Sequence, residues 1–196
     1  MIVHDDLEND ISAHEVLKCI KKLKNYKSCG YDGIFNEFLK TSSSKLLIAV
    51  TTLFNIVLQT GKIPHAWSIG YISPIYKGKG EGNDPDNYRG ITVLNCFGKL
   101  FTNVINDRSH SFLETNDILG NEQSGFRKGH STMDHVFALH CLIDVYLQPT
   151  TTTKKLFYAF IDYEKAFDSV QRGLLWGKLK FWYEWEGSTC DTRYVC

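Results

Sequence analysis

The chain has 196 residues, and its 22 Lys and Arg balance its 22 Asp and Glu, so a formal net charge of zero gives no global sign of a nucleic-acid partner. Hydrophobic residues make up 43% and aromatic residues 13%, enough for a core in roughly one domain or one and a half at about 100–200 residues each. The six cysteines lack CxxC and Cys/His-finger spacing, which argues against a disulfide framework or zinc site and favours a reducing compartment.

The start of the chain and its apolar segments indicate a cellular location. The first ten residues, MIVHDDLEND, are acidic and do not have the pattern of a signal peptide. No segment approaches the roughly 20 apolar residues that span a bilayer. We therefore expect a soluble intracellular chain, in the cytoplasm, the nucleus or both, without a membrane partner.

Charge is unevenly distributed along this neutral chain. Acidic residues crowd the start, whereas basic residues recur through the middle. The pattern is compatible with a local basic surface that binds nucleic acid, and also with an ordinary solvated face. The basic residues concerned are Lys77, Lys79, Arg89, Lys99, Arg108, Arg127 and Lys128.

Two amphipathic helices are predicted in the first third of the chain. Residues 12–15, Ser-Ala-His-Glu, form a capping box, and residues 16–23 then place their apolar side chains on one face at helical spacing. A turn with two glycines follows at residues 28–34. The second helix, residues 45–59, has a wide apolar face and ends at Gly61.

Two strands are predicted next, at residues 70–78 and 87–94, joined by a glycine-rich loop. Pro74 indicates an edge position or a bulge in the first strand. The loop glycines form neither a dinucleotide-binding fingerprint nor a P-loop, because no Gly-Lys-Ser/Thr and no helix follows them. Trp67, just before the first strand, is interpreted as a core residue rather than a ligand contact.

Two more helices are predicted in the middle of the chain. From Asn95 to Glu114 apolar residues recur at helical spacing, which predicts a stripe buried in the core. Ser131 opens a helix-start signature for a helix over Thr132–Leu147. We expect that helix to pack through Val136, Leu139, Leu142 and Ile143.

The stretch 156–170 carries the strongest chemical signal. Its first six residues, LFYAFI, are continuously apolar and predict a strand buried on both faces. Asp162 follows at the carboxyl end of that strand, where a carboxylate is costly unless it is paired or binds a metal. Asp168, with Gln171 three residues later, is predicted to cap a helix over Ser169–Lys180.

Several of these stretches resemble reverse transcriptases of non-LTR retrotransposons. The sequence Phe-Ile-Asp ending at Asp162, followed by Ala-Phe-Asp-Ser-Val at 166–170, resembles their first catalytic motif. Gln123, then Gly-Phe-Arg at 125–127 and the Ser-Thr pair at 131–132, resembles a second family segment. Asn-Tyr-Arg at 87–89 and Gly-Tyr-Asp-Gly-Ile at 30–34 resemble two others, although a simple inter-helix turn also explains residues 28–34.

The resemblance implies an α+β fold, the fingers and partial palm of a right-hand polymerase. It implies two Mg²⁺ ions, an RNA template, a DNA primer and deoxynucleoside triphosphates, and it leaves protein partners unknown. Asp162 would be the catalytic metal ligand, joined by the carbonyl of Tyr163, and Phe167 would lie under the nucleotide sugar. Arg89 would hold the triphosphate, which suits a guanidinium, or would be a surface cation. The expected template and primer contacts are Lys77, Gly125, Phe126, Arg127 and Lys128.

The family's later Asp-Asp pair does not follow in this chain, and residues 181–196 do not resemble the family. We therefore expect a helical segment at 1–27, a partial reverse transcriptase domain at 28–180 and a divergent tail at 181–196. On this reading the fragment, truncated before the second catalytic acid pair, is inactive because one carboxylate cannot hold two metal ions. The alternatives are a residual non-catalytic RNA- or DNA-binding protein and a poorly folded product with an exposed strand edge.

Overall fold

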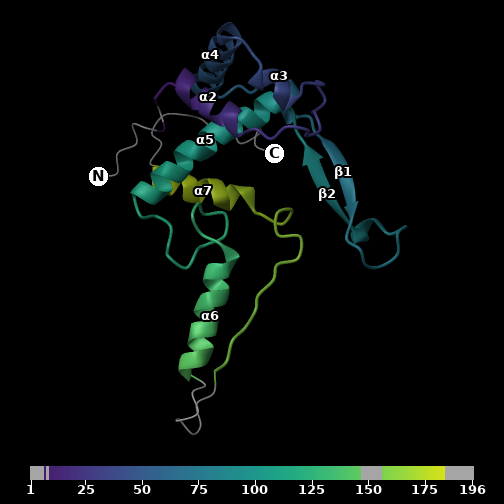
Figure 1. Ribbon diagram of the computed structural model, residues 1–196, viewed down its shortest axis with the longest axis vertical. Helices are drawn as coiled ribbons and strands as arrows, with labels where there is room; N and C mark the ends of the chain where they lie inside the picture. Colours follow the sequence, from purple (N-terminus) through teal and green to yellow (C-terminus); the bar gives the residue numbers. More distant parts are fainter. Residues whose placement is uncertain (1–6, 8, 147–155, 184–196) are drawn as a thin grey trace. The chain divides into compact units, whose positions relative to one another are not determined.

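The computed structural model describes residues 7, 9–146 and 156–183, which contain helices and one two-stranded antiparallel sheet (Figure 1). This mixed composition is consistent with the predicted α+β class. The described residues form two compact units, one up to Phe112 and one from Leu113 onward. Within the described ranges, no helix is long and apolar enough to cross a membrane.

Four helices build the core of the first unit: α2 (Ala13–Lys22), α3 (Asn36–Lys40), α4 (Ser44–Thr60) and α5 (Cys96–Thr115). The predicted capping box at α2 is confirmed, because the Glu15 amide donates to Ser12 Oγ and the Ser12 amide donates to Glu15 Oε2. α4 ends as predicted at Gly61, whose φ of 65° suits glycine. The buried core comprises Ile11, Val16, Cys19, Ile20, Leu39, Val50, Phe54, Cys96, Leu100 and Val104.

An aromatic cluster joins α4, the 3-10 helix η1 (His65–Ser68) and α5. The Phe54 ring lies edge-on to Trp67 at 5.8 Å between centroids and to Phe101 at 5.3 Å. The Trp67 and Phe101 centroids are 5.6 Å apart. These contacts confirm that Trp67 packs against the core, and such ring pairs add about 0.5–1.5 kcal/mol each beyond their buried area.

The glycine turn before α3 packs directly against the start of α5. The Gly33 amide donates to the Gly30 carbonyl at 3.1 Å, which confirms a turn. A Cβ on Gly30 would lie 2.4 Å from the Cα of Asn95, so only glycine fits there. Buried Asn95 in turn caps α5 by accepting the Gly98 amide at 2.7 Å and donating to the Ala66 carbonyl.

The sheet is a hairpin of β1 (Tyr71–Tyr76) and β2 (Tyr88–Val93), with the 3-10 helix η2 (Pro85–Asn87) in its connection. Pro74 lies opposite Gly90 in the register, and in a two-stranded sheet it occupies an edge strand as predicted. Figure 1 shows the hairpin projecting from the helices of its own unit. Apolar side chains are therefore exposed on both of its faces, including Ile72 and Ile75.

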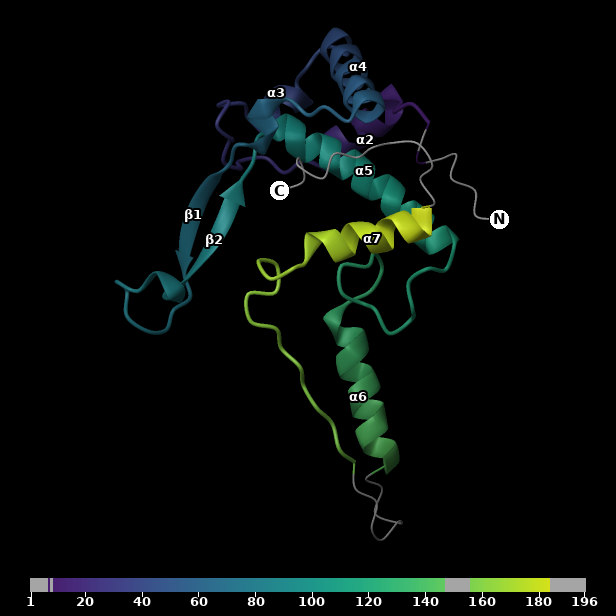
Figure 2. The same cartoon turned by 180° about the vertical axis from the view of Figure 1, so that it is seen from behind.

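The second unit contains α6 (Thr132–Tyr146) and α7 (Arg172–Tyr183). The predicted start of α6 is confirmed, because the Met133 amide donates to Ser131 Oγ and the Ser131 amide donates to Asp134 Oδ2. The predicted end at Leu147 lies outside the described residues. Figure 2 shows residues 156–163 as an extended trace that leads, through a turn, to α7.

Two predictions for the second unit are wrong, the buried strand at residues 156–161 and the helix cap at Asp168. Residues 156–161 form no strand, and Phe157, Phe160 and Ile161 are 80–85% exposed rather than buried. A strand needs a hydrogen-bonding neighbour, and the only ladder in the described part of the chain joins β1 to β2.

The packing predicted for α6 is correct in part. Leu139 and Ile143 are half-buried, whereas Val136 and Leu142 are exposed, and no described α6 residue is fully buried. Asp168 does not cap α7, since that helix begins at Arg172 and residues 164–169 form turns instead. There the Asp168 and Ser169 amides both donate to the Lys165 carbonyl, which ends that turn before the helix starts.

Candidate nucleotide and nucleic-acid contacts

Asp162 and Tyr163 lie at the end of the extended segment, and both are exposed. Their backbone belongs to no ladder, so the predicted support from a buried strand is missing around Asp162. Among the described residues, no group of three or more His, Cys, Asp or Glu side chains could hold a metal ion. These residues therefore do not fit a site for two Mg²⁺ ions, which needs several oxygen ligands.

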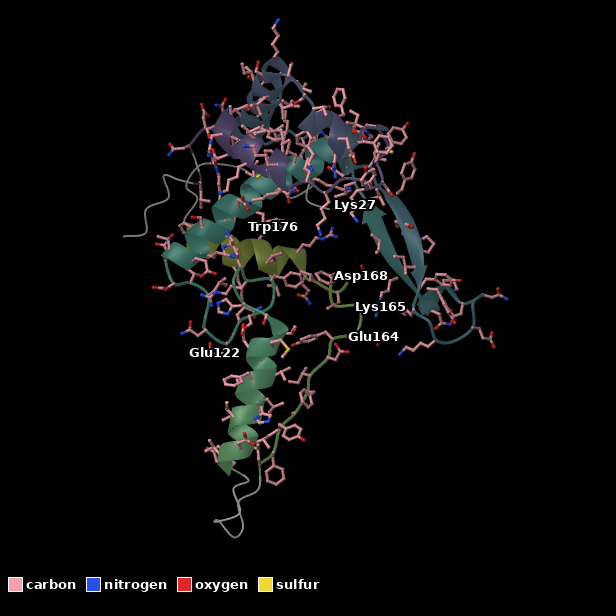
Figure 3. The ribbon with its side chains drawn as sticks, in the orientation of Figure 1. Lys27, Glu122, Glu164, Lys165, Asp168 and Trp176 are labelled. Atoms are coloured by element: carbon pink, nitrogen blue, oxygen red, sulfur yellow. The ribbon has the colours of Figure 1, made fainter. Side chains whose placement is uncertain are left out.

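Phe167 lies in the turn that connects this segment to α7. The turn places Lys165 at a φ of 48°, and the Ser169 hydroxyl donates to the Ala166 carbonyl at 3.2 Å. Phe167 is 80% exposed, so its ring is available to a ligand. Figure 3 labels the charged side chains of the same turn, Glu164, Lys165 and Asp168.

Two predicted contact residues come together in the second unit. The Phe126 ring, from the connection between α5 and α6, lies 6.2 Å from the Phe167 ring at an interplanar angle of 83°. Phe126 is 94% exposed, so neither ring belongs to a core. An exposed pair of aromatic faces is the kind of surface on which nucleic-acid bases stack.

Arg127, the residue after Phe126, is bound within the protein. Its Nε donates to Glu114 Oε1 at 2.7 Å and its Nη2 donates to Glu114 Oε2 at 2.9 Å. Its Nη1 donates to the Gly120 carbonyl at 3.0 Å, and the side chain is only 9% exposed. The hydrogen bonds to the Glu114 carboxylate raise the pKa of Arg127, so its guanidinium stays charged.

Sequence reasoning did not identify Glu114, because it stands 13 residues from Arg127 and lies in the last turn of a helix of otherwise ordinary pattern. The other contact residues in this connection are exposed. Gly125 accepts a hydrogen bond from Gln123 Nε2 at 2.9 Å through its carbonyl, and Lys128 lies at the surface.

Lys77 and Arg89 belong to the first unit, at the hairpin. Arg89 lies opposite Ile75 in the β1–β2 register and is exposed. Lys77 Nζ donates to the Asp86 carbonyl at 2.6 Å, so it links the end of β1 to the connection before β2. The ammonium group remains at the surface.

The seven basic residues of the middle region do not all contribute to one surface. Arg108 donates from Nε and Nη2 to Glu15 and from Nη1 to the carbonyl of Asn9, and its side chain is 8% exposed. Chiefly through the hydrogen bonds from Arg108, the pKa of Glu15 is lowered to about 2. Arg108 and Arg127 are therefore internal cations, whereas Arg89 is an exposed one.

Comparisons with known proteins agree with the motifs. Residues 76–183 match the family described as reverse transcriptase (RNA-dependent DNA polymerase). The chain is 31% identical over 170 residues to the probable RNA-directed DNA polymerase from transposon BS of Drosophila melanogaster. It is also 31% identical over 156 residues to that from transposon X-element and 29% identical over 167 residues to that from mobile element jockey, both from the same fly.

These alignments cover 87%, 80% and 85% of the chain but only 18%, 17% and 18% of the three relatives, so the chain spans less than a fifth of their length.

Proposed function

Because this chain belongs to the reverse transcriptase family, we propose that it is part of a non-LTR retrotransposon RNA-directed DNA polymerase and supplies template and nucleotide contacts. The observation that carries this proposal is the meeting of Phe126 and Phe167 at 6.2 Å. The two residues come from separate segments, each of which resembles the family. Their exposed rings offer a stacking surface, and Asp162 stands five residues before Phe167 in the sequence.

Within this proposal the first unit corresponds to fingers and residues 156–180 to the opening of a palm. Arg89 and Lys77 are assigned to phosphate contacts, Arg89 because its guanidinium is exposed and can grip two phosphate oxygens. Lys128 and the backbone of Gly125 are assigned to template contacts next to Phe126. Asp162 and the Tyr163 carbonyl are assigned as metal ligands of the whole polymerase.

No catalytic step through Mg²⁺ is assigned to this chain alone. The described residues supply Asp162 but not the cluster of oxygen ligands that two ions require. We therefore infer that the isolated chain binds nucleic acid without extending a primer.

Primer extension tests this proposal directly. The chain and its Asp162→Asn variant are incubated with an RNA template, an annealed DNA primer, Mg²⁺ and the four deoxynucleoside triphosphates. We expect no extension by either protein. Extension by the unaltered chain that is lost in the variant would show that the remaining metal ligands are present after all.

A second candidate function is non-catalytic binding of single-stranded RNA or DNA, favoured by the exposed aromatic pair and by exposed Arg89. Such binding weakens as salt rises, because bound cations on the nucleic acid are released. Fluorescence anisotropy of a labelled single-stranded RNA at several salt concentrations measures this. Affinity that does not respond to salt, or that is unchanged by Arg89→Gln, would contradict the assignment.

A further inference from the structure

In the connection between α5 and α6, residues 116–131, Arg127 forms an ion pair with Glu114 in the last turn of α5. We propose that Arg127 is a positioning residue that clamps this connection through Glu114, so that Phe126 projects toward Phe167, and that it is not itself a phosphate ligand. This inference rests on the proposed function, because it assigns Phe126 to nucleic-acid contact.

The N–H groups of the Arg127 guanidinium that could bind a phosphate already donate to other acceptors within the protein. Nε and Nη2 together face the two oxygens of Glu114, at 2.7 and 2.9 Å, and Nη1 faces the Gly120 carbonyl. A fork of this kind is the geometry by which arginine binds phosphate or carboxylate. A phosphate would therefore have to displace Glu114 from a side chain that is only 9% exposed.

The three hydrogen bonds from the Arg127 side chain join residues that are separated along the sequence, Glu114 and Gly120. Glu114 lies in the last turn of α5, which ends with the Asp117 amide donating to Glu114 and the Ile118 amide donating to Leu113. Gly120 lies in the middle of the connection. The Arg127 amide donates to the Ser124 carbonyl at 3.3 Å, so the backbone of Arg127 is fixed as well as its side chain.

Phe126 has a strained backbone conformation, which needs support from neighbouring contacts. Its φ is 59°, a left-handed value that bulky residues rarely adopt, and its side chain is 94% exposed. Burial of the ring does not compensate for this conformation. A strained and exposed aromatic residue indicates a functional constraint, and the clamp at the next residue provides the support.

The two roles of Arg127 predict opposite effects of changing Glu114. If Arg127 were a phosphate ligand, Glu114→Gln would release it and remove a repelling charge, so RNA binding would hold or tighten. If Arg127 is a positioning residue, Glu114→Gln and Arg127→Gln remove the same clamp. Each then weakens binding by the same factor, and the double variant is no worse than either single one.

Anisotropy with a labelled single-stranded RNA, using the full chain, measures these variants together with Phe126→Ala. Loss of base stacking predicts a drop of about 5- to 10-fold in affinity for Phe126→Ala, for Glu114→Gln, for Arg127→Gln and for the double variant of Glu114 and Arg127. The slope of log affinity against log salt stays unchanged in Arg127→Gln, whereas loss of a phosphate contact would reduce it by about 0.7 for a single strand. Glu122→Gln is the matched control, because it removes a negative charge from the same connection without removing a hydrogen-bond partner of Arg127. It should leave the affinity for RNA within about 2-fold, because exposed charges contribute little energy.

Arg127→Lys keeps the protein measurable if Arg127→Gln disturbs folding. It retains the charge but loses the fork that binds Glu114, so a positioning role predicts weakened binding, and binding equal to that of the unaltered chain would contradict the clamp. The proposal is overturned if Glu114→Gln holds or tightens binding while Arg127→Gln weakens it with a lower salt slope.

Hydrogen exchange separates the clamp from the proposed function. Amides of residues 116–131 should exchange faster in Glu114→Gln than in Glu122→Gln, and equal exchange in the two would overturn the clamp. If the unaltered chain binds no RNA, or Phe126→Ala has no effect on binding, the proposed function fails even where the clamp is intact.

Discussion

The two units of the chain differ in where their apolar side chains lie. In the first unit, Phe54, Leu100 and Val104 are at most 1% exposed, and helices from distant parts of the sequence surround them. In the second unit, Phe157, Phe160 and Phe167 are at least 80% exposed. The first unit has a buried core that stabilises it, whereas these three rings of the second unit lie at the surface, available to ligands or other segments. Substitutions in the buried core of the first unit should change stability, and those at the exposed rings Phe126 and Phe167 of the second should change binding.

The largest effect is expected at the centre of the aromatic cluster. Phe54→Ala should lower the free energy of unfolding by about 3–5 kcal/mol, because Phe54 is fully buried between Trp67 and Phe101 and its loss leaves a cavity. Urea unfolding followed by far-ultraviolet circular dichroism measures this. Phe38→Ala, at a ring 55% exposed in the same unit, is the matched control and should cost under about 1 kcal/mol. Equal losses would contradict the assignment of the core.

The next effect is expected at the Arg108–Glu15 pair. Arg108→Gln should destabilise the chain by about 2 kcal/mol, below the range for fully buried pairs because Glu15 is 31% exposed. The loss arises because Glu15 and the carbonyls of Asn9 and Asp10 lose their donors. Arg89→Gln removes the same charge from an exposed strand and should change stability by less than about 0.5 kcal/mol. Similar melting temperatures for the two variants would show that Arg108 does not anchor the segment before α2.

Acid should weaken the same anchor by a smaller amount. The pKa of Glu15 is lowered from 4.5 to about 2, first of all by its hydrogen bonds from Arg108. Since the folded pKa lies below the unfolded one, this contribution is complete above about pH 4.5 and disappears as the pH falls toward 2. After allowance for solvent screening it amounts to about 1–2 kcal/mol. The free energy of unfolding is measured for the unaltered chain and for Glu15→Gln between about pH 6 and about pH 3. The two values should converge as the pH falls, because Glu15 becomes protonated. A constant difference would contradict this role.

Local patterns predicted the first unit well, because its elements are encoded in neighbouring residues. Ser12 and Glu15 specify the start of α2, Gly61 ends α4, and the helical spacing of Leu100 and Val104 marks the buried face of α5. Each signal acts within a few residues, so no knowledge of distant partners was needed.

The wrong strand at residues 156–161 and the missed ion pairs share one physical cause, dependence on partners that lie far away in the sequence. Whether residues 156–161 are buried depends on neighbouring strands that an apolar run does not reveal. The Arg108–Glu15 pair spans 93 residues and the Arg127–Glu114 pair spans 13, so neither was visible as a motif. In the same way, the pairing of Phe126 with Phe167 is visible only in the structure, although the sequence marks each of them as a candidate contact.

The smallest stability effect is expected in the second unit, and it tests the failed strand prediction most sharply. Phe157 is 85% exposed, so Phe157→Ala should change the free energy of unfolding by less than about 0.5 kcal/mol. Burial in a strand covered on both faces would instead predict a loss of about 3–5 kcal/mol for the same substitution. Urea unfolding distinguishes the two, and Phe54→Ala measured in parallel shows that the assay detects the loss of a buried ring. A large effect at Phe157 would mean that residues 156–161 find a partner strand in solution, through a contact between copies or within the chain, and that Asp162 then has the rigid support that the sequence predicted.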